Sequence, residues 1–148
     1  MTVTASPPLS RRDLLSATGY GVVIWIVATA LLVTVGSDLV PDAGLLSGVL
    51  LVVGFGVVAL GVAAVAYLIY RRKRADSITL RLLFGTVIAA TGLLLDAVVY
   101  GAAGGRYPVL SDQQQGPVAF FLVLAYGLLL LAPHLCRKRN APGASEPA

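Results

Sequence analysis

The sequence predicts an all-α membrane protein with four transmembrane helices in an antiparallel bundle and both termini on the cytoplasmic side. Of the 148 residues, 57% are hydrophobic and only 12% are charged, and the mean hydropathy is +0.87. A soluble domain of this size could not bury so much apolar surface. Four apolar runs are each long enough to cross a hydrocarbon core of roughly 30 Å as a helix. The basic residues gather at the ends of these runs, where such residues set membrane topology.

The N-terminal segment is expected to lead directly into the first helix. Residues 1–9 are rich in Ser, Thr and Pro and are predicted to form a flexible tail. Ser10, followed three residues later by Asp13, is typical of a helix start, and the paired Arg11 and Arg12 would hold this end in the cytoplasm. A twin-arginine export signal is the alternative, because paired arginines precede an apolar run. Against it, that run is long for a signal and three more apolar runs follow.

The four spans are expected to form one membrane domain over residues 10–139, followed by a second flexible tail over residues 140–148. Gly36-Ser37-Asp38 supplies a glycine and turn residues and is predicted to end the first span. Pro117 is predicted to open the fourth span, because its missing N–H is harmless in the first helical turn. The predicted spans are residues 18–35, 44–70, 79–100 and 117–136.

The second span carries small residues at helical spacing, which predicts one smooth face. In lipid such a face lets helices approach closely and gain van der Waals contact. Packing within the subunit is one interpretation of this face, and a homodimer interface is the other. The residues of the face are Gly56, Ala59, Ala63 and Ala66.

Two basic clusters lie at the ends of apolar runs and predict the orientation of the chain. With both termini inside, ten of the 11 basic residues fall on the cytoplasmic side, and only Arg106 falls outside. We interpret the clusters as topology anchors, although clustered basic residues also bind anionic lipid. Arginine outnumbers lysine by nine to two, which suggests a prokaryotic plasma membrane. The clusters are Arg71, Arg72, Lys73 and Arg74, and Arg137, Lys138 and Arg139.

Asp96 is the only acidic residue inside the predicted spans and is the leading candidate for a functional site. The small residues 4, 7 and 11 positions before it fall on the same helical face, so the carboxylate is expected to face another helix rather than lipid. Intramembrane acids often mark ion or substrate pathways, which favours a proton or cation site. The small residues are Gly85, Ala89 and Gly92.

A structural role for Asp96 is the alternative, as a buried brace paired with hydroxyl groups or with Arg106, the only cation expected on that side. Such a pair would fix the long connection between the third and fourth spans. Tyr107 and the residues after it, through Leu110, are predicted to lie on the bilayer surface with the tyrosine at head-group level.

Enzymatic and nucleic-acid-binding functions are not expected. The sequence contains no phosphate-binding loop, no dinucleotide fingerprint, no zinc-protease motif and no nucleophile elbow. His134 and Cys136 are the single histidine and the single cysteine, so we expect neither a metal site nor a cofactor. The basic residues lie beside apolar runs, which argues against nucleic acid as a partner.

The run Leu93-Leu94-Leu95-Asp96, a loop with an aromatic residue and a closing apolar helix resemble small four-helix prokaryotic membrane proteins that are known only as a domain of unknown function. That resemblance implies no activity. In length and number of spans the chain is also similar to the small multidrug-resistance transporters. Those proteins carry their essential carboxylate in the first helix, whereas residues 18–35 contain none.

We therefore expect a small integral membrane protein that acts by helix–helix association, with a second copy of itself or with a larger membrane complex. The alternative is a proton- or cation-coupled transporter of a small molecule that uses Asp96. The lipid bilayer is the expected partner in both cases.

Overall fold

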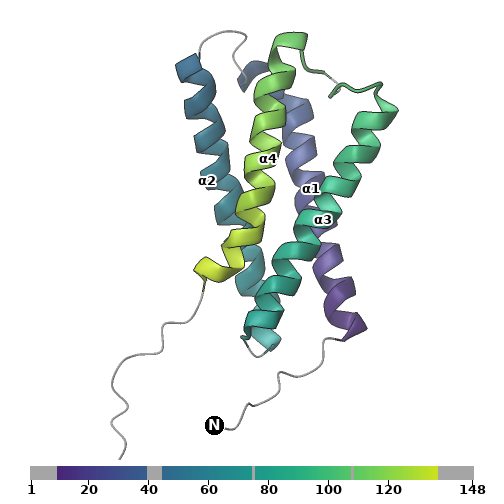
Figure 1. Ribbon diagram of the computed structural model, residues 1–148, viewed down its shortest axis with the longest axis vertical. Coiled ribbons are helices and arrows are strands. Elements are labelled where there is room, and N and C mark those ends of the chain that lie inside the picture. The colour runs from purple at the N-terminus through teal and green to yellow at the C-terminus, as the bar shows by residue number, and fades with distance from the viewer. Residues whose placement is uncertain (1–9, 40–44, 75, 108, 137–148) are drawn as a thin grey trace, which may run out of the picture.

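Four long helices make up most of the computed structural model (Figure 1), which describes residues 10–39, 45–74, 76–107 and 109–136. Each helix is long and apolar enough to cross a membrane, so the predicted helical, multi-pass class is confirmed. Successive helices run in opposite directions (Figure 1). The elements are α1 (Arg11–Leu39), α2 (Leu45–Tyr70), the short 3-10 helix η1 (Arg71–Lys73), α3 (Ile78–Ala102) and α4 (Asp112–Leu135).

Helix α1 begins where the sequence predicts but ends later. The Asp13 N–H donates to Ser10 Oγ (3.2 Å), and the Ser10 N–H donates to Asp13 Oδ2 (3.2 Å), which is the reciprocal arrangement of a capping box. The predicted end at Gly36 is wrong, because α1 continues to Leu39. Gly36 serves packing instead: a Cβ atom there would lie 3.1 Å from Leu32 and 3.6 Å from Leu110.

Helix α4 begins before the predicted proline. Ser111 and Gln114 form a capping box, in which the Ser111 N–H donates to Gln114 Oε1 (3.0 Å). The helix therefore starts at Asp112, and Pro117 lies inside it. The prediction that Pro117 opens the helix is wrong, because the cap at Ser111, six residues upstream, supplies the stronger start signal.

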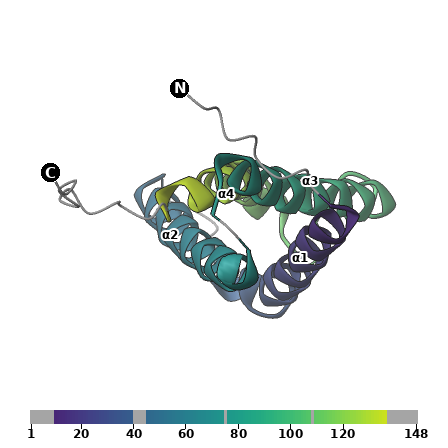
Figure 2. The same ribbon diagram turned by 90° about the horizontal axis from the view of Figure 1, so that it is seen from below.

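The helices pack as a chain of pairs: α1 against α3, α3 against α4, and α4 against α2. Figure 2 shows this order from one end of the molecule. Helices α1 and α2 meet at few residues, although they are consecutive in sequence. Of the four helices, α1 is therefore the least covered by the rest of the protein.

Glycines mark the close approaches between helices. A Cβ atom at Gly85 of α3 would lie 3.0 Å from the Leu130 carbonyl oxygen of α4, and one at Gly56 of α2 would lie 3.2 Å from the side chain of Leu124. The small-residue face of α2 thus turns toward α4, with Gly56, Ala63 and Ala66 buried. This placement favours packing within the subunit over a dimer interface for that face. The partly buried residue of the face is Ala59.

The end of the molecule that carries η1, here called the η1 end, is filled by aromatic side chains. Tyr67, Tyr70 and Phe84 are almost completely buried, and the ring centroids of Tyr70 and Phe84 lie 4.6 Å apart. Tyr20 of α1 meets both of these rings edge-on, at 5.9 Å. These contacts join α1, α2 and α3 and place a cluster of packed aromatic rings at the η1 end.

Candidate functional site

Asp96 lies on the buried face of α3 and is 8% exposed. The residues that share this face, Gly85, Ala89 and Gly92, are also buried. The structure thus places Asp96 on the side of α3 that meets other helices.

Three neutral donors from three different elements converge on the Asp96 carboxylate. Trp25 of α1 donates its indole N–H to Oδ1, with a nitrogen–oxygen distance of 2.7 Å. The phenol of Tyr107, in the connection between α3 and α4, donates to the same oxygen. The phenol of Tyr126 on α4 donates to Oδ2. The carboxylate therefore ties α1, the connection and α4 to α3.

Of the two partners expected for a structural brace, hydroxyl groups are present as the phenols of Tyr107 and Tyr126, whereas the expected ion pair with Arg106 is wrong. Arg106 instead pairs with Asp112, with 2.7 Å between Nη1 and Oδ1, and both side chains are about two-thirds or more exposed (67% and 74%). A guanidinium keeps its hydration more easily at the exposed end of the helices than next to a buried carboxylate. In the described residues no basic side chain forms an ion pair with Asp96.

Gly92 makes room for one of the three donors. A Cβ atom at Gly92 would lie 2.6 Å from Cε1 of the Tyr126 ring, which is too close for any side chain. The ring therefore occupies the space that the glycine leaves and brings its hydroxyl to Asp96, one helical turn further along α3. The sequence predicts Gly92 as a helix contact, and the structure adds this specific reason for the glycine.

Tyr107 enters the protein rather than lying on the bilayer surface. Gly104 and Gly105 have positive φ angles of 67° and 81°, a conformation that glycine adopts at little cost and that turns the chain back after α3. Gln115 then holds the segment, since its Oε1 accepts from the Tyr107 N–H (2.9 Å) and its Nε2 donates to the Tyr107 carbonyl (3.1 Å). Tyr107 is 4% exposed, so the prediction that this residue lies on the bilayer surface is wrong, whereas Val109 is exposed (60%). Burial, followed by the hydrogen bond to Asp96, raises the pKa of the Tyr107 phenol.

Asp96 and its donors lie on the wall of a cavity of about 290 Å³, close to the lower limit of ordinary ligand sites. All four helices contribute to the lining, and Asp96 is the only charged residue among the lining residues. Aromatic rings from Phe55 and Phe121 add to those of the donors. The remaining wall is mostly aliphatic, so the cavity is apolar except at the carboxylate and its donors.

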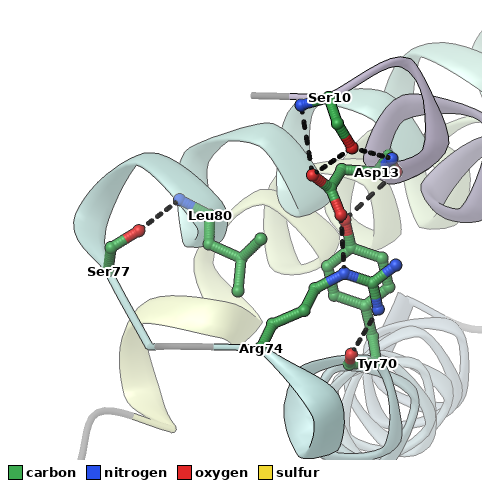
Figure 3. Close-up of polar contacts among 6 residues, drawn as sticks. All are labelled: Ser10, Asp13, Tyr70, Arg74, Ser77 and Leu80. Atoms are coloured by element: carbon green, nitrogen blue, oxygen red, sulfur yellow. Dashed lines mark hydrogen bonds and ion pairs between the residues drawn. The ribbon is translucent and has the colours of Figure 1, made fainter. Parts of the chain in front are cut away.

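The predicted basic cluster after α2 has a structural role at the η1 end. Figure 3 shows Arg74 reaching Asp13, with 2.7 Å between Nε and Oδ1, and also donating to the Tyr70 carbonyl at 2.7 Å. The Arg74 guanidinium lies over the Tyr70 ring, 4.0 Å from its centroid. Arg72 and Lys73 remain exposed. The second basic cluster, residues 137–139, and both predicted tails, residues 1–9 and 140–148, lie outside the described residues.

A second acidic residue organises the other half of this end. Asp76 accepts two hydrogen bonds from Arg81 (3.0 and 3.1 Å) and one from the Tyr67 hydroxyl (2.6 Å). Arg71 lies 3.4 Å from the same carboxylate and donates to the Cys136 carbonyl at the end of α4 (2.8 Å). Burial opposes ionisation of Asp76, but the hydrogen bonds from Arg81 and Tyr67 and the nearby arginine charges outweigh it, so the pKa of Asp76 lies below its usual value.

The sequence points to Asp96 but not to its partners. Trp25 is the only tryptophan in the chain, and Tyr126 lies in the middle of an apolar run. Buried Trp and Tyr side chains usually find a hydrogen-bond partner for their polar tips. Trp25 and Tyr126 both lie inside predicted spans and both need a hydrogen-bond partner there. Since the spans contain a single acid, this need is the signal that could have linked them to Asp96.

In the part of the chain that the structure describes, no group of three His, Cys, Asp or Glu side chains could hold a metal ion. No family model, curated protein or solved structure matches this chain. Its function is therefore inferred from the site alone.

Proposed function

We propose that this protein is a small multi-pass membrane protein that binds an organic cation in the cavity, with Asp96 as the counter-ion, and that it acts as a proton- or cation-coupled transporter of that molecule. The observation that carries the proposal is a buried carboxylate on an apolar cavity, with no ion-pair partner among the described residues. The three donors to Asp96 are neutral, so they stabilise its negative charge without cancelling it.

The lining of the cavity favours a cation with an apolar body. The faces of aromatic rings attract cations, and Trp25, Phe55 and Phe121 contribute such rings. Aliphatic side chains make up most of the remaining wall and suit an uncharged hydrocarbon part of the ligand. Asp96 is the only carboxylate among the lining residues, and its oxygens already accept hydrogen bonds from Trp25, Tyr107 and Tyr126, which does not favour a small inorganic ion that needs several free oxygen ligands.

Coupling follows from the chemistry of a single carboxylate. Asp96 can hold a proton or face an organic cation, but protonation removes the charge that attracts the cation. Binding of one therefore opposes binding of the other, and this exclusion is the minimum requirement for exchanging them across a membrane.

The proposal includes a membrane orientation. The four helices would cross a plasma membrane as an antiparallel bundle with both termini in the cytoplasm, because this orientation leaves ten of 11 basic residues inside. The η1 end would then face the cytoplasm, and the connection that carries Tyr107 would face outward.

The proposal can be tested with phenyltrimethylammonium and its neutral isostere, tert-butylbenzene, on protein in lipid nanodiscs. Trp25 is the only tryptophan and touches Asp96, so its fluorescence reports directly on the site. We expect the cation to change this fluorescence in the wild type and to bind at least tenfold more weakly to Asp96→Asn. The neutral compound should bind both proteins equally. Equal affinity of the cation for the two proteins would contradict the proposal.

Transport is tested separately in sealed vesicles. We expect an imposed pH gradient to drive uptake of the cation by the wild type and not by Asp96→Asn. Asp112→Asn is the matched control, because Asp112 is exposed and pairs with Arg106 away from the cavity. Binding without any gradient-driven uptake would limit the function to binding.

Association with a second copy or with a membrane complex is the second candidate function. It is favoured by the exposure of α1, of whose most apolar stretch only 11% is buried, compared with 28–33% in the other helices. Such a face meets either lipid or another helix. The mass of the protein in nanodiscs and in mild detergent tests this candidate, which predicts a dimer or a co-purifying partner and is contradicted by a lone monomer in both.

A further inference from the structure

The cavity opens sideways, between α1 and α2. Several of its lining side chains are also about half exposed, which means that they stand at its mouth rather than in its depth. They come from these two helices and are aliphatic. The mouth residues are Val23, Val27 and Leu31 of α1 (60%, 54% and 57% exposed) and Val58 and Val62 of α2 (59% and 46%).

On its other described sides the cavity is bordered by buried or half-buried residues. Its back wall is made by buried residues of α3 and α4, among them Ile88, Val118 and Leu129. The aromatic side chains of Tyr70 and Phe84 fill the η1 end. At the opposite end Tyr107 is drawn inward onto Asp96. In a membrane, the space between α1 and α2 would therefore face the hydrocarbon of the bilayer.

Polarity changes along the cavity. Asp96 and Tyr107 lie toward the end that carries the α3–α4 connection, and the lining residue of α3 farthest from them is Ile88. Asp96 and Ile88 are therefore separated along α3 by about 12 Å, at a rise of 1.5 Å per residue. The carboxylate and its donors thus form a polar patch on the cavity wall, and the lining on the side toward the η1 end, which includes Ile88 and Leu129, is apolar.

We propose that the cation bound by Asp96 is a single-chain amphiphile that enters from the bilayer between α1 and α2 and keeps its hydrocarbon tail at that mouth. This inference rests on the proposed function and names its ligand class. The polar head would lie beside Asp96, near the membrane surface, and the tail would point toward the membrane centre. An amphiphile already has this orientation in the lipid leaflet, so it could enter by lateral movement, with no apolar part exposed to water.

The test compares two trimethylammonium ions, one with a decyl chain, used below its micellar concentration, and one with a phenyl group. Both are titrated into nanodiscs and followed through Trp25 fluorescence. The mouth variant is Val58→Phe, and its matched control is Val65→Phe, since Val65 lies on the same helix with similar exposure (57% against 59%) and does not line the cavity.

We expect the decyl compound to bind the wild type at least tenfold more tightly than the phenyl compound, after correction for partitioning into protein-free nanodiscs. Val58→Phe should remove most of that advantage and leave the affinity of the phenyl compound within about twofold, while Val65→Phe should change neither. If the phenyl compound binds through Asp96 but chain length and Val58→Phe have no effect, the amphiphile inference is wrong and the proposed function stands. If neither compound binds, the amphiphile inference and the proposed function are both wrong.

The competing occupant of the mouth is a helix of a second copy. Val58→Cys in a Cys136→Ser background leaves one thiol per chain, because Cys136 is the only cysteine. We expect this thiol to react with a lipid-soluble maleimide and to form no disulfide-linked dimer upon oxidation. Efficient dimer formation through position 58, together with loss of maleimide labelling, would overturn the inference.

Discussion

The two halves of this molecule hold their acidic side chains in different ways. At the η1 end, Asp76 and Asp13 lie near the tips of the helices and are paired with arginines. On the cavity wall, Asp96 is held by two phenols and an indole. A guanidinium at a helix tip can remain partly hydrated, whereas one placed beside Asp96 would have to lose its water. Charge pairs therefore suit the ends of a membrane protein, and neutral donors suit its interior.

The same two halves differ in packing. The η1 end is filled by rings in direct contact. Ion pairs join the segment after α2 to α1 and α3, and a hydrogen bond from Arg71 joins it to the end of α4. The other half contains a cavity, and its polar contacts converge on one carboxylate. This contrast suggests a rigid end that holds the helices together and a hollow half that can accept a ligand. The predictions below test this division.

The largest effect on stability is expected from Gly92→Leu. The new side chain would overlap the ring of Tyr126, so it should displace that ring and remove its hydrogen bond to Asp96. Overpacking together with a lost charge-assisted hydrogen bond should cost about 3 kcal/mol or more. Thermal unfolding in a single detergent measures the loss.

Leu94→Ala is the control for Gly92→Leu. Leu94 is 69% exposed and, in a membrane, would face lipid, so its truncation should change stability by less than about 0.5 kcal/mol. Equal unfolding temperatures for the two variants would contradict the packing of α3 against α4 through Gly92.

A smaller loss is expected at the η1 end from Asp76→Asn. The change leaves Arg71 and Arg81 without their carboxylate, and hydrogen bonds to charged groups contribute about 1.5–3 kcal/mol each. The pair is partly exposed (12% and 16% for the side chains of Arg81 and Asp76), so water can replace part of the lost hydrogen bonding. We therefore expect the free energy of unfolding to fall by about 2 kcal/mol. Asp76→Asn should leave cation binding at Asp96 unchanged. Weakened binding would show that the two halves are coupled.

The contribution of the Asp76 carboxylate should also appear in the pH dependence of stability. The folded protein lowers the pKa of Asp76, so the stability that this residue contributes is complete above its unfolded pKa of about 3.9 and is lost as the pH falls further, through the folded value. We expect wild type to lose stability relative to Asp76→Asn as the pH falls below about 4. Parallel unfolding curves for the two proteins over this range would mean that the Asp76 carboxylate is not held by arginines.

Some of this organisation follows from the sequence and some does not. Apolar length alone predicts four helices, and Ser10 with Asp13 predicts where α1 begins, because these signals are local. The end of α1 does not follow from its glycine, because Gly36 continues the helix and packs near Leu110. At the start of α4 two local signals compete, and the cap at Ser111 overrides Pro117.

The site shows the same limit. Its central residue is predictable, because an acid in an apolar run is rare and costly. Its partners are not, because Trp25, Tyr107 and Tyr126 lie 71, 11 and 30 residues away from Asp96 in sequence and meet it only after the helices pack. Arg106 has the right charge and lies close in sequence, yet it pairs with Asp112 at the surface.

A small effect is expected from Arg106→Gln. Its ion pair with Asp112 is largely exposed, and exposed pairs contribute about 0.2–1 kcal/mol. Because Arg106 does not pair with Asp96, the stability effects of Arg106→Gln and Asp96→Asn should add to within about 0.5 kcal/mol in the double variant. A strongly non-additive stability effect in the double variant would indicate that Arg106 does pair with Asp96 and would contradict the structure.

The most direct test of the central claim, that Asp96 is the shared acceptor on the cavity wall, is the NMR signal of the Trp25 indole N–H. With a single tryptophan, ¹⁵N-indole-labelled protein in nanodiscs gives one resonance for this group. We predict that this resonance shifts in Asp96→Asn and upon addition of the decyl ammonium ion, and that it stays in place in Asp112→Asn. An indole resonance that is the same in wild type and Asp96→Asn would contradict the account.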